Sequence, residues 1–321
     1  MSTIERAAAR LGAIGKVRAE PLVRDPAAVG DPRGTDSPHD SAPHVAQPVD
    51  AIPAGPNDLP AFPTTRARST IGGGYCEIDV RALTTAGFAT PENVNFEIAA
   101  DLRRIKRPLL MAVKRSAALG NSGLPHNLIF ITSALPGEGK TFVSINLALS
   151  IAAELDRTVL LVDADVAKND VARVLGISYE FGLTDLLSRD SLPPDDVIMQ
   201  TNIESLSFLP SGRMLPNVDE LFASDRMSRL VRELADRDPN RIVIVDGPPL
   251  HAGTEAGVLA RMVGHVIVLV EADRTPQASL EDAMHQLKSC PSVSMILNKA
   301  RRRASDHVTY GYGYGYGNQG N

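Results

Sequence analysis

The sequence predicts an α/β fold in which a mostly parallel sheet is covered by helices on both faces. Continuous apolar runs of the kind found in fully buried strands occur at residues 127–132, 158–162, 206–209, 241–245, 265–270 and 294–297. Helical segments alternate with these runs at residues 140–153, 225–236 and 276–288. Apolar strands that alternate with helices are typical of a sheet buried on both sides.

Composition and charge restrict the class of protein. The chain has 321 residues, of which 43% are hydrophobic and 22% charged, so it is long enough for a full core. Its net charge of -5 and pI of about 5.8 disfavour wholesale binding of nucleic-acid phosphates, and we expect no nucleic-acid partner. The two cysteines, Cys76 and Cys290, lie far apart and predict neither a disulfide framework nor a zinc module.

The chain contains no apolar run of about 18 residues and no secretory leader pattern, which favours a cytoplasmic protein. Residues 1–20 place apolar side chains from Ile4 to Ile14 at helical spacing, as in a short amphipathic helix, although a frayed helix fits equally well. Residues 21–70 hold ten prolines and predict a disordered linker. The expected division continues with a connecting segment (71–94), the α/β domain (95–300) and a flexible Tyr/Gly tail (301–321).

A glycine-rich loop is the strongest chemical signal. It reads SALPGEGKT from Ser133 to Thr141 and lies between a predicted strand and a predicted helix, as a P-loop must. Glycines let several backbone N–H groups point at one anion, and the helix N-terminus adds a positive dipole end. Lys140 is expected to reach the β- and γ-phosphates, and the Thr141 hydroxyl to bind Mg²⁺. The sequence therefore predicts a P-loop NTPase fold that binds a nucleoside triphosphate together with Mg²⁺. The candidate nucleotide-binding residues are Pro136, Gly137, Glu138, Gly139, Lys140, Thr141, Phe142 and Asn298.

Acidic residues end two of the predicted strands. Asp163 and Asp165 follow the first strand at i and i+2, and Asp246 follows another. Ligands of open α/β sheets bind at the carboxyl ends of the strands, so these acids should converge on the P-loop. Together with Thr141 they form the predicted metal site, although each acid alone also suits a helix cap or a turn. For Asn298 two interpretations stay open, an amide that recognises the nucleotide base and a simple loop asparagine.

From about residue 95 to the end, the chain resembles the bacterial tyrosine kinases (BY-kinases) that act in exopolysaccharide export. The matched motifs are A-x-P-G-E-G-K-[ST] at 134–141, D-x-D at Asp163 and Asp165, D-x-P-P at Asp246, Pro248 and Pro249, and a terminal cluster of Tyr310, Tyr312, Tyr314 and Tyr316. The preceding part is similar to the subgroup that accompanies the exosortase system, on the evidence of Leu83, Gly87, Thr90, Pro91 and the RIKRPLL segment at 104–110.

The resemblance implies that the nucleotide is ATP and that the chain is an ATP-dependent protein-tyrosine autokinase that regulates exopolysaccharide synthesis or export. Lys140, Asp163 and Asp165 are then the catalytic residues, either aspartate accepting the tyrosine proton, and the four tail tyrosines are the phosphate acceptors. The implied partners are a membrane chain-length regulator (a polysaccharide co-polymerase) that recruits the kinase to the inner face of the membrane, a tyrosine phosphatase, and further copies of the chain. The family's oligomerisation motif E-x-x-R-x-x-R fits in two registers, Ala100/Arg103/Lys106 and Asp101/Arg104/Arg107.

Three alternatives compete with this interpretation. A ParA/MinD-like positioning ATPase carries a second lysine where this chain has Leu135, and an iron–sulfur carrier ATPase carries a cysteine pair that this sequence lacks. A catalytically weak ATP-binding adaptor of an export complex fits the P-loop equally well. The Tyr-Gly repeat also has a plainer interpretation, a cohesive low-complexity tail.

Overall fold

The computed structural model describes residues 17–19, 74–90, 96–119 and 123–300, which form one continuous sheet with its helices. The sheet has nine strands in the order β1-β9-β8-β3-β7-β4-β6-β5-β2, and every neighbouring pair is parallel except β5 with β6. The strands are β1 (Val17–Ala19), β2 (Tyr75–Cys76), β3 (Leu128–Ser133), β4 (Thr158–Asp163), β5 (Met199–Thr201), β6 (Leu206–Leu209), β7 (Arg241–Asp246), β8 (His265–Glu271) and β9 (Val293–Asn298). The predicted mostly parallel sheet is confirmed. The ends of β3, β4, β6, β7, β8 and β9 lie within one residue of the expected runs, whereas β1, β2 and β5 were not predicted.

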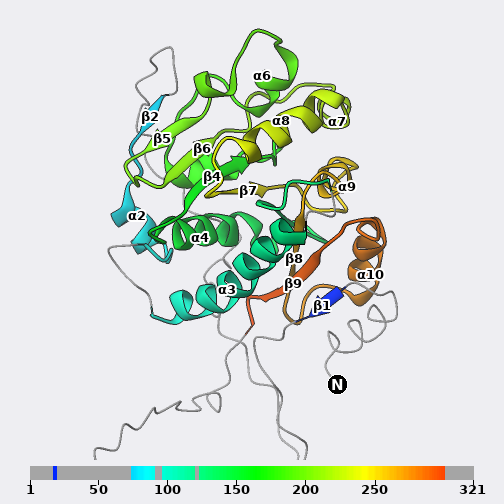
Figure 1. Ribbon diagram of the computed structural model, residues 1–321. Coiled ribbons are helices and arrows are strands. Elements are labelled where there is room, and N and C mark those ends of the chain that lie inside the picture. The colour runs from blue at the N-terminus through cyan, green and yellow to red at the C-terminus, as the bar shows by residue number, and fades with distance from the viewer. Residues whose placement is uncertain (1–16, 20–73, 91–95, 120–122, 301–321) are drawn as a thin grey trace, which may run out of the picture.

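Helices cover both faces of the sheet (Figure 1). One face carries α2 (Val80–Thr85), α3 (Phe96–Leu119), α4 (Lys140–Ala152) and α5 (Asp170–Leu175). The other carries α6 (Leu183–Ser188), α7 (Val218–Phe222), α8 (Asp225–Asp236), α9 (Glu255–Ala260) and α10 (Gln277–Gln286). In the described residues no helix is both long enough and apolar enough to cross a bilayer.

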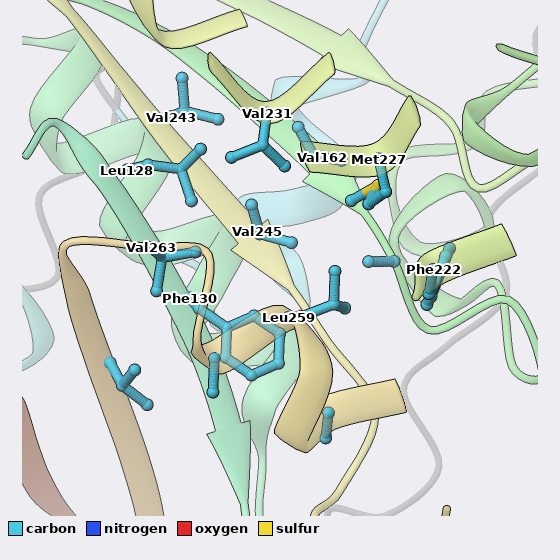
Figure 2. Close-up of a cluster of buried hydrophobic side chains, with 14 of the residues drawn as sticks. Leu128, Phe130, Val162, Phe222, Met227, Val231, Val243, Val245, Leu259 and Val263 are labelled. Atoms are coloured by element: carbon cyan, nitrogen blue, oxygen red, sulfur yellow. The ribbon is translucent and has the colours of Figure 1, made fainter. Parts of the chain in front are cut away.

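The alternation of side chains along β3 divides the core into two clusters. Leu128 and Phe130 point to the cluster under α6 to α10, which Figure 2 shows with Val243 and Val245 of β7 beside them. Ile129 and Ile131 point to the cluster under α2 to α5. Because β3 is buried on both faces, it reads as an unbroken apolar run rather than an alternating one.

The central position of β3 places its C-terminal loop in the middle of the sheet. β3 pairs with β7 on one side and β8 on the other, and β7 pairs with β4. The carboxyl ends of these parallel strands therefore meet at one edge, directly beside the start of α4. Ligands of open α/β sheets bind at such an edge, and the predicted site residues follow these strands.

The segment expected to connect the linker to the domain contributes to the sheet itself. β2 pairs with β5, and Cys76, Ile78, Leu83 and Phe88 are buried in the core cluster under α2 to α5. At the opposite edge, β1 pairs with β9. The helical spacing noted between Ile4 and Ile14, the whole of the predicted linker (21–70) and the tyrosine tail lie outside the described residues.

Candidate active site

The P-loop joins β3 to α4 in the geometry needed for anion binding. Gly137 and Gly139 adopt positive φ angles of 85° and 93°, which only glycine takes without strain. Gly139 is the N-cap of α4 and provides no side-chain hydrogen bond to the first helical N–H groups. Those donors, together with the helix dipole, face the space where a phosphate group would lie.

Lys140 lies beside the acids that the sequence placed at the strand ends. Its side chain is buried, and its Nζ lies 3.9 Å from Asp165 Oδ2. Asp163 and Asp246 are directly opposed across the β4–β7 pair. Asp246 accepts hydrogen bonds from Thr141 Oγ1 at 2.7 Å and Ser144 Oγ at 2.8 Å. The structure thus brings one lysine, two hydroxyls and three carboxyl groups to one edge of the sheet.

Burial disfavours the charged forms of the three acids at this edge. Burial, followed by repulsion from Asp246 and Asp165, raises the pKa of Asp163 well above its usual range. Burial raises the pKa of Asp246 to about 6, although Lys140 and the two hydroxyls oppose the shift. Burial also raises the pKa of Asp165, again against the effect of Lys140. Each charged form would be stabilised by a cation.

Asp163 has a carboxylate oxygen that could bind such a cation. Its Oδ1 accepts a hydrogen bond from the Asp165 N–H at 3.2 Å, while its buried Oδ2 has no hydrogen-bond partner among the described residues. An orphaned, buried carboxylate oxygen is a suitable ligand for a hard cation such as Mg²⁺. No trio of His, Cys, Asp or Glu in the described part of the chain is arranged as an all-protein metal centre.

The remaining predicted nucleotide-binding residues have different surroundings. Pro136 is exposed on the loop. The ring of Phe142 packs on Phe88 with 4.8 Å between centroids, so the side chain belongs to the core. The buried Glu138 carboxylate accepts a hydrogen bond from the Leu135 N–H at 2.9 Å and another from the Thr275 hydroxyl, which ties the loop together.

Asn298 and its neighbour contact the P-loop backbone. Asn298 Nδ2 donates to the Glu138 carbonyl at 2.8 Å, and Lys299 Nζ donates to the Gly137 carbonyl at 2.7 Å. The sequence did not predict Ser144, Thr275 and Lys299 as site residues. The one available signal was that Lys299 directly follows Asn298, a predicted site residue at a strand end.

A cavity of about 420 Å³ opens beside Asp165. Apolar side chains of Met214, Leu215, Phe222 and Pro248 form much of its lining, and Asp219 and Glu255 add carboxyl groups. Because Asp165 is part of the lining, a molecule in the cavity would lie next to the strand-end acids.

The β3–loop–α4 unit and the buried acids opposite it define a P-loop ATPase. The AAA domain family model matches residues 126–295, which is more than half of the chain. Tyrosine-protein kinase YwqD of Bacillus subtilis is 31% identical over 183 residues, which cover 57% of this chain and 76% of that protein. Tyrosine-protein kinase etk of Escherichia coli K12 is 35% identical over 189 residues, covering 58% of this chain and 25% of etk.

Solved kinase domains share the fold. The kinase domain of Escherichia coli tyrosine kinase ETK aligns with a TM-score of 0.50 at 27% identity and covers 63% of this chain and 77% of that domain. The VpsO kinase domain aligns with a TM-score of 0.50 at 29% identity, covering 62% and 98% of the two chains. The chain belongs to the bacterial tyrosine-protein kinases of the AAA domain family. AmsA of Erwinia amylovora is another curated relative, and the match covers 25% of its length, so this chain spans only about a quarter of that protein.

Proposed function

We propose that this chain is an ATP-dependent protein-tyrosine kinase that phosphorylates Tyr310, Tyr312, Tyr314 and Tyr316 in its C-terminal tail. The observation that carries the proposal is the joint placement of Lys140, Thr141 and the three strand-end acids around the start of α4. Family membership supports the same activity.

The proposed mechanism uses each group for its charge. Lys140 leaves Asp165 and neutralises the β- and γ-phosphates of ATP, while the loop N–H groups hold the phosphate oxygens. Thr141 and the acids Asp163 and Asp246, directly or through water, would hold Mg²⁺, which supplies charge neutralisation when bound. Mg²⁺ commonly takes one or two carboxylates together with phosphate oxygens and water.

We assign the role of base to Asp165 rather than to Asp163. Asp165 lines the cavity, whereas Asp163 is fully buried against Asp246. A tyrosine ring in the apolar part of the cavity would bring its hydroxyl to Asp165. The tyrosine O–H then gives its proton to Asp165, its oxygen forms a bond to the γ-phosphorus, and the bond to the β-phosphate oxygen breaks to release ADP.

The proposal includes transfer between copies of the chain. A fully extended segment from 301 to 316 spans about 50 Å, which reaches the site of a neighbouring molecule. On α3 the register Asp101/Arg104/Arg107 suits contact with a neighbour, because Arg104 and Arg107 are exposed. In the other register, Lys106 is buried and donates to the Ser150 carbonyl at 2.9 Å. Each phosphotyrosine adds a charge of about -1.5 to -2, so phosphorylated tails would repel and loosen the assembly.

The biological setting is proposed from the family resemblance. The kinase would regulate exopolysaccharide synthesis or export at the inner face of the cytoplasmic membrane. A membrane chain-length regulator would recruit and activate it, and a tyrosine phosphatase would reverse the modification.

Two of the alternatives, the positioning ATPase and the ATP-binding adaptor, have less support. Leu135 occupies the position of the extra lysine of positioning ATPases and packs against the core cluster under α6 to α10. A catalytically weak adaptor would bind ATP through the same loop but transfer no phosphate. Only measured phosphotyrosine separates the adaptor from the kinase.

The experiment mixes two full-length variants with ATP and Mg²⁺. One is Lys140→Met with an intact tail, and the other has a wild-type site but all four tail tyrosines changed to Phe. We expect phosphate on the tail of the Lys140→Met protein, and none on that protein alone, with both variants showing the wild-type circular dichroism spectrum. Phosphotyrosine on Lys140→Met incubated alone would refute the assigned site. An unlabelled tail in the mixture, with wild type labelling itself at a rate independent of concentration, would refute transfer between copies.

A further inference from the structure

Two consecutive residues after β9 hold two consecutive carbonyl groups of the P-loop. Asn298 Nδ2 donates to the Glu138 carbonyl at 2.8 Å, and Lys299 Nζ donates to the Gly137 carbonyl at 2.7 Å. The contact is close, since a Cβ atom added at Gly139 would lie 2.3 Å from Asn298 Nδ2. Gly139 also adopts a φ of 93°, a conformation that favours glycine at this position.

Because a peptide unit is planar, these contacts also fix the orientation of the N–H groups on the opposite side of the same peptide units. In a planar trans peptide the carbonyl and the following N–H point in opposite directions. A donor that fixes the Gly137 carbonyl therefore also fixes the Glu138 N–H, and a donor on the Glu138 carbonyl fixes the Gly139 N–H. Those N–H groups lie in the loop segment that must point at a phosphate.

Charge strengthens the arrangement. The Lys299 ammonium group polarises the peptide unit whose carbonyl it contacts, which makes the N–H on the other side a better donor. Lys299 adopts a positive φ of 56°, unusual for a residue other than glycine, and its side chain is mostly buried. Its Nζ also pairs with Glu271 Oε2 at 3.1 Å, so the ammonium group is anchored at β8.

A second connection from β8 reaches the same loop. The Glu271 N–H donates to Thr275 Oγ1 at 2.9 Å, and the Thr275 hydroxyl donates to the buried Glu138 carboxylate. The ends of β8 and β9 thus support the P-loop from the side opposite to the phosphate site. Nothing in this arrangement requires a nucleotide base.

We propose that Asn298 and Lys299 are positioning residues that orient the P-loop N–H groups toward the phosphates. This inference deepens the proposed function, because it rests on nucleotide binding at the same loop. It also distinguishes the two interpretations of Asn298. A residue that orients the loop affects every polyphosphate ligand equally, whereas a residue that recognises the base affects only the nucleotide that carries it.

The test measures binding by the full-length chain with Mg²⁺ present, using isothermal titration calorimetry. The probes are ATP, GTP and inorganic tripolyphosphate, which has no base. The variants are Asn298→Ala, Lys299→Met and Lys299→Arg. Arg274→Met is the matched control, because Arg274 contacts the same Glu271 carboxylate at 3.4 Å but is exposed and makes no contact with the loop among the interactions described.

We expect Asn298→Ala and Lys299→Met to weaken all three probes by a similar factor, roughly tenfold, the scale of one hydrogen bond. Lys299→Arg, which keeps a charged donor, should recover part of the loss, and Arg274→Met should stay within about twofold of wild type. Tripolyphosphate affinity unchanged in both Asn298→Ala and Lys299→Met would overturn the inference, as would an Asn298→Ala effect confined to ATP. If the Asn298 and Lys299 variants lose affinity as expected but wild type shows no kinase activity, the proposed function is refuted and this inference stands. A wild-type chain that binds none of the probes would refute both.

Discussion

Thr141 Oγ1 donates a hydrogen bond of 2.7 Å to Asp246 Oδ2 and thereby joins the first turn of α4 to the end of β7. The same hydroxyl is the one that a P-loop offers to Mg²⁺. Asp246 is fully buried and also accepts a hydrogen bond from Ser144, so its carboxylate is held in place. The pair thus connects the P-loop to the acids at the strand ends.

The position of Asp246 predicts a pH dependence of stability. Its pKa is about 6 in the folded chain and near 3.8 in the unfolded chain, so between these values the folded state binds more protons. The contribution of Asp246 to stability is therefore fully present below about pH 3.8 and is lost as the pH rises through about 6. We expect Asp246→Asn to raise the free energy of unfolding by about 3 kcal/mol at pH 8, with a much smaller effect at pH 4.

Urea unfolding of both proteins across this pH range measures the difference. His265, whose pKa is lowered by burial, acts in the opposite direction, but it is present in both proteins and largely cancels in the comparison. An Asp246→Asn protein less stable than wild type at pH 8 would show that the hydrogen bonds of the carboxylate outweigh the cost of its burial.

The two acids of the D-x-D motif should differ in their effects on catalysis. We expect Asp165→Asn to lower the rate of tyrosine phosphorylation at least about 100-fold while the Kd for ATP with Mg²⁺ stays within about threefold, because the variant loses the base but keeps the groups assigned to ATP and Mg²⁺. Asp163→Asn should instead weaken Mg²⁺-dependent ATP binding, because it loses the orphaned oxygen.

Single-turnover rates and calorimetric affinities, measured for both variants, separate the two roles. The reversed pattern, with a binding defect in Asp165→Asn and a purely catalytic defect in Asp163→Asn, would exchange the assignments.

Gly139 and Gly87 form a matched pair for testing the loop geometry. Their φ angles are 93° and 87°, so alanine meets a similar backbone penalty of about 1–2 kcal/mol at each position. A Cβ at Gly87 would have no atom within 4 Å, whereas one at Gly139 would displace Asn298. We expect Gly139→Ala to weaken ATP binding at least about tenfold and Gly87→Ala to leave it near wild type.

The ATP affinity of each variant is the measurement. Thermal unfolding checks that the backbone penalty is similar in the two variants. Equal affinities in the two variants would mean that contact with Asn298 does not shape the loop.

Phosphate should accumulate on the tail rather than on the tyrosines of the folded part. Tyr179 is partly buried, and its hydroxyl lies 3.2 Å from both Ser211 Oγ and the Gly212 carbonyl. Tyr75 is 53% exposed but its backbone is part of strand β2, so it serves as the control for simple accessibility. We expect mass spectrometry of the wild-type protein to place most phosphate at Tyr310, Tyr312, Tyr314 and Tyr316. A dominant signal at Tyr75 or Tyr179 would contradict the proposed acceptor.

The local pattern of the sequence determined the parts of this protein that depend on adjacent residues. Six apolar runs predicted strands β3, β4, β6, β7, β8 and β9. The spacing of Gly137, Gly139, Lys140 and Thr141 predicted the loop, since a strand–loop–helix connection is specified within one short segment. The acids could be placed as well, because parallel strands bring their carboxyl ends to one edge.

Only the tertiary structure decided which residues meet across that edge. Asn298 and Lys299 lie 160 and 162 residues along the chain from the carbonyl groups that they contact. Asp165 lines the cavity while Asp163 faces Asp246, although both belong to one short motif. Such differences depend on strand order and register and on the helices packed above them. These are set by the burial of the whole core, so they leave no signal in the spacing of neighbouring residues.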